Sequence, residues 1–193
     1  NKLGSIISVI GSPVNTAWTP HMYKISKENN AAQQYAKTTT YVFAFLFVFV
    51  TFLGSFAPEI VALASAPAYQ DAEGVLLPIA IGSAFFIFRP STRVGLTLSN
   101  KTKIFPLLTL IPLVIGFPVT YYLSLIYGAE GAAWGCCLVL FGVIISTALY
   151  SNRYLVVPYE IIKLIKMVLL SFALILLTRN IFNDQLAVKI LLF

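Results

Sequence analysis

Long apolar runs recur along the chain and are separated by short segments that carry most of its charge. Each run holds roughly 20 residues or more, enough to cross about 30 Å of hydrocarbon at about 1.5 Å per helical residue. Lipid offers the backbone no hydrogen-bonding partner, so the runs are predicted to be helices. The predicted spans are Leu3–Tyr23, Thr38–Ala64, Val75–Leu98, Ile104–Tyr127, Gly131–Tyr150 and Ile161–Thr178, followed by a segment that begins near Leu186.

Composition also indicates that the chain is surrounded by lipid. The chain is 59% hydrophobic and only 10% charged, with a mean hydropathy of +0.87, whereas about a quarter of the residues of a soluble domain are charged. Such a chain cannot cover itself with polar surface in water. We therefore expect an all-α, polytopic transmembrane helix bundle whose surroundings are membrane lipids and which has no nucleic-acid partner.

The basic residues alternate between loops, and this alternation predicts an orientation. The segments after the second and fourth spans hold only the acids Asp71, Glu73 and Glu130, and the segment after the sixth holds Arg179 and Asp184. Lys and Arg in short loops stay on the cytoplasmic side, so the odd-numbered loops are predicted to be cytoplasmic and Asn1 to lie outside. The residues that carry this prediction are Lys24, Lys27, Lys37, Lys101, Lys103 and Arg153, with Lys163 and Lys166 just beyond.

The two ends of the sequence indicate part of a longer protein. It starts at Asn1 without an initiator methionine and stops at Phe193 inside an apolar run. A first residue outside the membrane implies an odd number of earlier spans before it. The neighbouring cysteines, Cys136 and Cys137, cannot readily form a disulfide with each other and are expected to pack in lipid.

Two arginines inside the third predicted span are the strongest candidates for chemistry. Arg89 and Arg93 are four residues apart, so they share one helical face. An arginine at the centre of a membrane helix costs about 2.5 to 3.5 kcal/mol, so it usually faces protein or a water-filled cavity. Snorkelling to the headgroups is the alternative, and it is the preferred one for Arg93. For Arg89 we expect a cationic cavity, which would bind an anion through charged hydrogen bonds.

Other chemistry is weakly represented. The single histidine, His21, lies with Lys24 at the end of the first predicted span, and both are secondary candidates for the mouth of a cavity. Tyr121 and Tyr122 are secondary candidates for contacts to a sugar. The sequence contains no HExxH, nucleophile elbow, phosphate-binding loop or paired intramembrane carboxylates, so we expect no enzyme activity, metal or cofactor.

Proline and glycine mark the predicted helices. Prolines inside the spans, at positions 13, 20, 90, 106, 112 and 118, either bend helices around a cavity or reflect the general tolerance of membrane helices for proline. Gly131 and Gly135 have the GxxxG spacing that lets two helices approach closely. Packing is the expected role of this pair.

The order of several short motifs resembles the lipid-linked polysaccharide flippases, which export O-antigen or capsule units within the multidrug/oligosaccharidyl-lipid/polysaccharide exporter superfamily. Ala17–Lys24 resembles the small-aromatic-x-Pro-x-x-Tyr-basic end of a family helix, and Tyr127–Ala133 resembles the family's G-x-x-GAA turn. Further similar pieces are Ala57–Leu63, Tyr69–Ala72 and the polar, basic turn Ser99–Lys103.

The resemblance covers residues 1–150 and implies that they form most of the second lobe of a two-lobed transporter, with residues 151–193 as trailing helices and the amino-terminal lobe absent. It implies translocation of an undecaprenyl-pyrophosphate-linked oligosaccharide across the bacterial inner membrane by alternating access. Arg89 and Arg93 would then attract the pyrophosphate. The alternatives are a cation-coupled multidrug exporter of the same superfamily and a membrane-embedded polysaccharide polymerase or acyltransferase.

Overall fold

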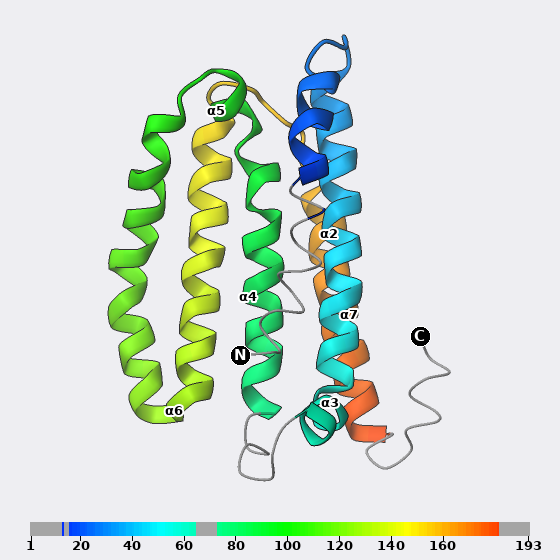
Figure 1. Cartoon of the computed structure of the whole chain (residues 1–193), viewed down its shortest axis with the longest axis vertical. Coiled ribbons are helices and arrows are strands. Elements are labelled where there is room, and N and C mark those ends of the chain that lie inside the picture. Colours follow the sequence, from blue (N-terminus) through cyan, green and yellow to red (C-terminus); the bar gives the residue numbers. More distant parts are fainter. Residues whose placement is uncertain (1–12, 14–15, 65–72, 182–193) are drawn as a thin grey trace.

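The structure, a computed structural model, describes residues 13, 16–64 and 73–181, and these residues form helices without any strand (Figure 1). Its helices are α2 (Ala31–Ser55), α3 (Ala57–Ala64), α4 (Glu73–Thr92), α5 (Val94–Leu98), the 3-10 turn η2 (Thr102–Ile104), α6 (Phe105–Ser151) and α7 (Ile161–Ile181). A further helical stretch covers residues 16–25. The predicted all-α bundle is confirmed.

Four helices of the described residues, α2, α4, α6 and α7, are long and apolar enough to cross a membrane. Helix α6 does so twice, because it reverses at Gly128, where φ is 59° and ψ is −133°. Its first arm (residues 105–127) and second arm (residues 129–151) run side by side (Figure 1), and each is about 34 Å long at the helical rise. The chain is a multi-pass membrane protein.

Two predicted spans differ from the observed helices at their ends. The predicted helix Thr38–Ala64 begins seven residues earlier, at Ala31, and breaks at Phe56 before α3. The predicted helix Val75–Leu98 breaks at Arg93, between α4 and α5. Pro58 follows the first break by two residues, and a proline disfavours the helical conformation of the residue before it, whereas Pro90 lies inside α4, three residues before the second break. Most of the predicted first span, the motif Tyr69–Ala72 and the segment near Leu186 lie outside the described residues.

Helix α2 packs against α4 and α7, and α4 packs in turn against α6. Aromatic residues fill the centre of this arrangement. The Phe43 ring lies 4.3 Å from that of Phe47 and 5.1 Å from that of Phe88, distances at which aromatic pairs stabilise one another. Apolar side chains on the outer surface of the first arm of α6, such as Ile115 and Phe117, are more than two-thirds exposed. An exposed surface of that kind fits lipid and not water.

Glycines set the distance between the two arms of α6. A Cβ atom on Gly135 would lie 2.6 Å from the Cα of Thr120, and one on Gly131 would lie 2.0 Å from the carbonyl oxygen of Leu123. These positions therefore tolerate no side chain. The packing role predicted for this GxxxG pair is confirmed, although the helix that it contacts is the preceding arm of the same hairpin.

The basic residues of the alternate loops come together at one end of the bundle. The end of the 16–25 helix, the start of α2, the start and end of α6 and the start of α7 all meet there (Figure 1). At this end Glu160 accepts hydrogen bonds from Lys163 Nζ at 2.5 Å and from Thr40 Oγ1 at 3.0 Å. These bonds, that of Lys163 first, hold the pKa of Glu160 below its usual range. Glu160 thereby joins the start of α7 to α2.

Gly135→Ala is expected to lower the free energy of unfolding by about 1 to 3 kcal/mol, because the new methyl group overpacks the hairpin. Cys136→Ala is the matched control, since Cys136 is the next residue and its side chain is exposed. Thermal unfolding in detergent, followed by circular dichroism, measures both. Equal unfolding midpoints would show that the arms are not held at the distance described.

Acidification is expected to weaken the contact between α2 and α7. A carboxyl group whose folded pKa is depressed stabilises the fold above its unfolded pKa, and this contribution disappears as pH falls through the folded value. The unfolding temperature of the native protein should therefore fall once the pH is lowered below about 4. Glu160→Gln should remove this part of the pH dependence, and an unchanged pH profile in that variant would refute the role of Glu160.

Candidate cationic site

The candidate site lies where α4 ends. Arg89 is three residues from the last residue of α4, and Arg93, with φ of −109° and ψ of 17°, separates α4 from α5. Pro90 has no backbone N–H and its ring clashes with the carbonyl group four residues earlier, here that of Phe86. The break itself falls after Thr92, where the Arg93 N–H donates to the Pro90 carbonyl oxygen at 3.4 Å and the Arg89 carbonyl oxygen accepts from Thr92 Oγ1 at 2.9 Å. The break also brings Arg89 nearer to the end of its helix than a continuous span to Leu98 would.

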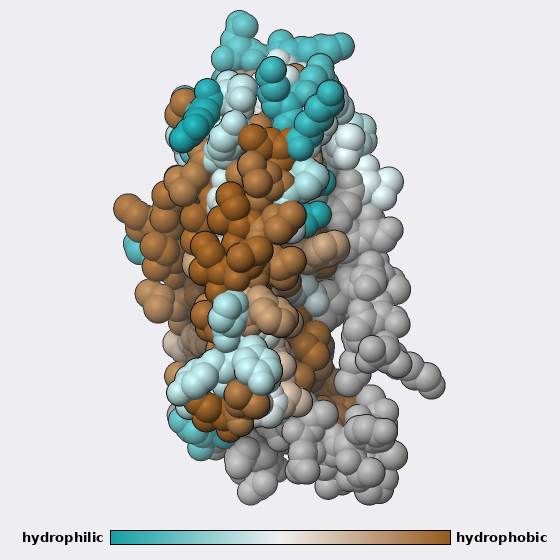
Figure 2. Space-filling view, turned by 90° about the vertical axis from the view of Figure 1, so that its left-hand side faces the viewer, coloured by the Kyte–Doolittle hydropathy of each residue, from teal (hydrophilic) through white to brown (hydrophobic). Residues whose placement is uncertain are grey.

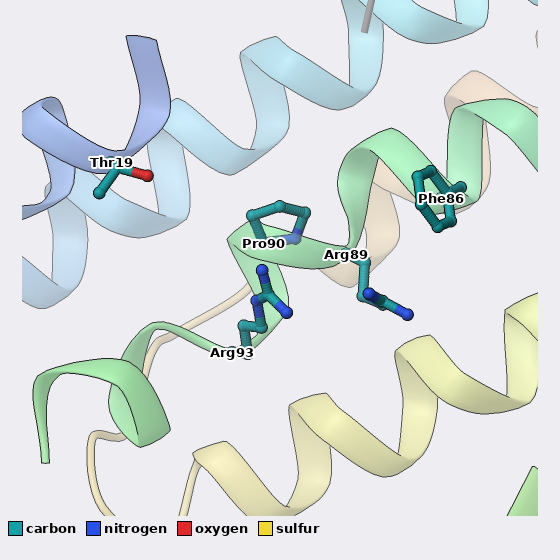
Figure 3. A pocket seen from close by; sticks show the side chains of 5 residues that line it. All are labelled: Thr19, Phe86, Arg89, Pro90 and Arg93. Atoms are coloured by element: carbon teal, nitrogen blue, oxygen red, sulfur yellow. The ribbon is translucent and has the colours of Figure 1, made fainter. Parts of the chain in front are cut away.

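Arg89 and Arg93 line one cavity of about 180 Å³, together with Thr19, Phe86 and Pro90. In Figure 3 both arginines extend from the end of α4 on either side of Pro90, and Thr19 lies across from Pro90 on the 16–25 helix. The expectation that Arg89 lines a cavity therefore has a geometric basis, and Arg93 joins it there. A cavity of this size is smaller than the usual drug-sized site of about 300 to 1,000 Å³. It has room for a small anionic group.

Each guanidinium group is placed over an aromatic ring. The Cζ atom of Arg89 lies 5.2 Å from the ring centre of Phe86, and that of Arg93 lies 5.0 Å from the ring centre of Phe105. Cation–π contacts of this length are favourable by about 0.5 to 2 kcal/mol. They hold the planar groups in position and leave their N–H donors for other partners.

Within the described part of the chain, no carboxylate pairs with either arginine. Glu59 belongs to α3, at the opposite end of the bundle (Figure 1). Two like charges four residues apart on a helix repel each other. An anion bound between Arg89 and Arg93 would therefore remove a repulsion as well as form new bonds.

The last turn of α4 is held by its neighbours. Thr92 Oγ1 lies 3.0 Å from Thr147 Oγ1 of α6, and the Tyr159 hydroxyl group donates to the Ser91 carbonyl oxygen at 3.4 Å. Burial raises the pKa of Tyr159 to about 12, so this phenol stays protonated and remains a donor. These bonds fix the backbone that carries the two arginines.

The structure does not bring the secondary candidates into this cavity. His21 and Lys24 are exposed on the 16–25 helix, beside the cavity-lining Thr19. Tyr121 and Tyr122 are exposed on the first arm of α6, about 24 Å along the helix axis from its start at Phe105. The tyrosines thus lie towards the opposite end of the bundle from the arginines.

Three residues of the site were not predicted from the sequence: Thr19, Phe86 and Phe105. Phe86 is one turn before Pro90 on the helical face of Arg89, so helical spacing could have indicated it. Thr19 and Phe105 come from other segments, and no local pattern connects them to the arginines. Among the described residues no group of three or more His, Cys, Asp or Glu side chains lies close enough to hold a metal ion.

Comparison with protein-family models, with curated proteins and with solved structures gives no match. The class of the protein rests on its fold and its site: it is a multi-pass helical membrane protein with a cationic cavity at the end of α4.

Water is expected to reach this cavity. On a background of Cys136→Ala and Cys137→Ala, Thr19→Cys should react with a water-soluble maleimide, because the reaction requires a hydrated thiolate. Val114→Cys is the matched control, since Val114 is similarly exposed but lies in the apolar surface of α6. Equal labelling at the two positions would contradict a hydrated cavity within a lipid-facing bundle.

Proposed function

We propose that this chain is the second-lobe part of a flippase that carries a polyprenyl-pyrophosphate-linked oligosaccharide across the bacterial inner membrane. One observation carries the proposal: Arg89 and Arg93 line the same cavity near the end of a membrane helix, and no carboxylate of the described residues pairs with them. The order of the short motifs that resemble this family supports it. The basic end of the bundle would face the cytoplasm.

The chemistry of the cavity favours an anionic cargo. Guanidinium groups remain protonated in surroundings of low polarity and bind phosphate oxygens in pairs. A cavity of about 180 Å³ would take the charged pyrophosphate group and leave the glycan outside it. The glycan would then contact the rest of the transport path, including the amino-terminal lobe of the same protein.

The alternatives expected from the sequence require features of another kind. A cation-coupled multidrug exporter would place an acidic residue deep in the membrane, but Arg89 and Arg93 give this cavity the opposite charge. A polymerase or acyltransferase would need polar catalytic groups, and the residues that line the cavity are two arginines, a threonine, a phenylalanine and a proline.

Complementation tests the proposal. The full-length protein is expected to restore surface glycan in a bacterium that lacks its own polysaccharide flippase and makes a matching repeat unit. Arg89→Ala should abolish the restored glycan, whereas Arg89→Lys should retain part of it, because lysine keeps the charge but loses the paired hydrogen bonds. Membrane expression of each variant is measured alongside.

Lys27→Ala is the matched control, since it removes one exposed positive charge outside the cavity and should leave surface glycan unchanged. Restored glycan in Arg89→Ala would contradict the role of the cavity. If the native protein restores no surface glycan with matched repeat units but lowers drug accumulation, the proposal of a flippase would give way to that of a multidrug exporter.

A further inference from the structure

A second cationic cluster lies at the open end of the α6 hairpin, where the first arm begins and the second arm ends. Lys101 and Lys103 precede the first arm, and Arg153 follows the second. All three side chains are exposed. On the face that Figure 2 turns to the viewer, hydrophilic residues gather at one end and a broad hydrophobic band lies below them.

Two tyrosines lie close to Lys101 and Arg153 of this cluster. The Cζ atom of Arg153 lies 5.1 Å from the ring centre of Tyr150, and the rings of Tyr150 and Tyr154 are 6.0 Å apart. Lys101 and Arg153 both act electrostatically on the Tyr150 hydroxyl group. Cations from both ends of the hairpin therefore converge on one pair of phenols. Tyrosines of this kind are enriched where a membrane meets water.

The positive charge of this cluster is not balanced by the carboxylates at the same end of the bundle. Glu28 is hydrogen-bonded to Gln34, and Glu160 to Lys163 and Thr40, so both are engaged with the segments around α2 and α7. Helix α6 has no acidic residue in its first turn and no side-chain cap. The partial positive charge of a helix N-terminus therefore adds to that of Lys101 and Lys103.

Exposed apolar side chains lie directly along the arms from this cluster. Leu107, Leu110 and Ile111 follow on the first arm, and Leu149 precedes Tyr150 on the second; all are about half exposed or more. A ligand that matches this succession has a negatively charged head and long apolar chains. An anionic phospholipid of the surrounding bilayer has that form, and each cation near the membrane surface favours it.

We propose that Lys101, Lys103 and Arg153, with Tyr150 and Tyr154, bind the phosphate headgroup of an anionic phospholipid whose acyl chains lie along the two arms of α6. This site is separate from the cavity of Arg89 and Arg93, and it does not depend on the proposed transport function. Its expected effect is to fix the depth of the hairpin in the membrane.

Native mass spectrometry of the full-length protein in neutral detergent, with added phosphatidylglycerol, measures the binding. Replacing Lys101, Lys103 and Arg153 together by Gln is expected to weaken phosphatidylglycerol binding about tenfold or more, because three attractive charges are lost. The matched control replaces Lys24, Lys27 and Lys37 by Gln. It also removes three positive charges from the basic end of the bundle, but from the segments beside α2, and it should change phosphatidylglycerol binding less than threefold.

Three outcomes would overturn the proposal. Equal loss in the two triple variants would show that net charge attracts the lipid without a site at the hairpin. Equal binding of phosphatidylcholine and phosphatidylglycerol by the native protein would show that the negative headgroup is not recognised. Displacement of phosphatidylglycerol by an equal concentration of inorganic phosphate would show that the cluster binds free phosphate and not a lipid.

Discussion

Helices α3, α4 and α6 all contain prolines, and each proline removes a backbone donor in a medium that has no water to replace it. At two of these prolines a side chain from another helix or arm supplies a replacement donor. Ser146 donates to the carbonyl oxygen of Leu108, four residues before Pro112, at 2.9 Å. Arg179 Nε donates to the carbonyl oxygen of Gly54, four residues before Pro58, at 3.3 Å. At Pro58 and Pro112, side chains thus replace the missing helical bond and join the kinked segment to its neighbour.

The cationic site lies beside one of these prolines. Helix α4 ends at Thr92, two residues after Pro90, so Arg93 lies at a break in the backbone and Arg89 lies in the last turn before it. The bonds of Thr92 and Tyr159 then hold that break against α6 and the segment before α7. A cavity between α4 and the 16–25 helix follows from this arrangement, and the two guanidinium groups give it a net positive charge.

Much of the fold was predictable from the sequence, because an apolar run of membrane-spanning length must form a helix in lipid. The spans at α2, α4, α6 and α7 were predicted, and the turn between the two arms of α6 was placed within three residues of Gly128. Helix ends were predicted less well. The early start of α2 at Ala31 lies in the polar segment Ala31–Lys37, where hydropathy carries no signal for a helix.

The site was only partly predictable. Charge in an apolar run identified Arg89 and Arg93, since the cost of burial makes such residues stand out. The residues that complete the cavity come from segments far apart in the sequence, and their contribution depends on how helices pack. Tyr121 and Tyr122 show the limit of residue type as a guide, because both are suited to sugar binding yet lie about 24 Å from the start of α6.

The most direct test of the central claim measures binding of an anion by the two arginines. Phosphorus NMR of a short-chain polyprenyl pyrophosphate, added to the purified full-length protein in neutral detergent, reports on its headgroup alone. We predict line broadening with the native protein and its loss in the Arg89→Ala, Arg93→Ala double variant. Equal broadening with both proteins, each shown to be folded, would contradict the account.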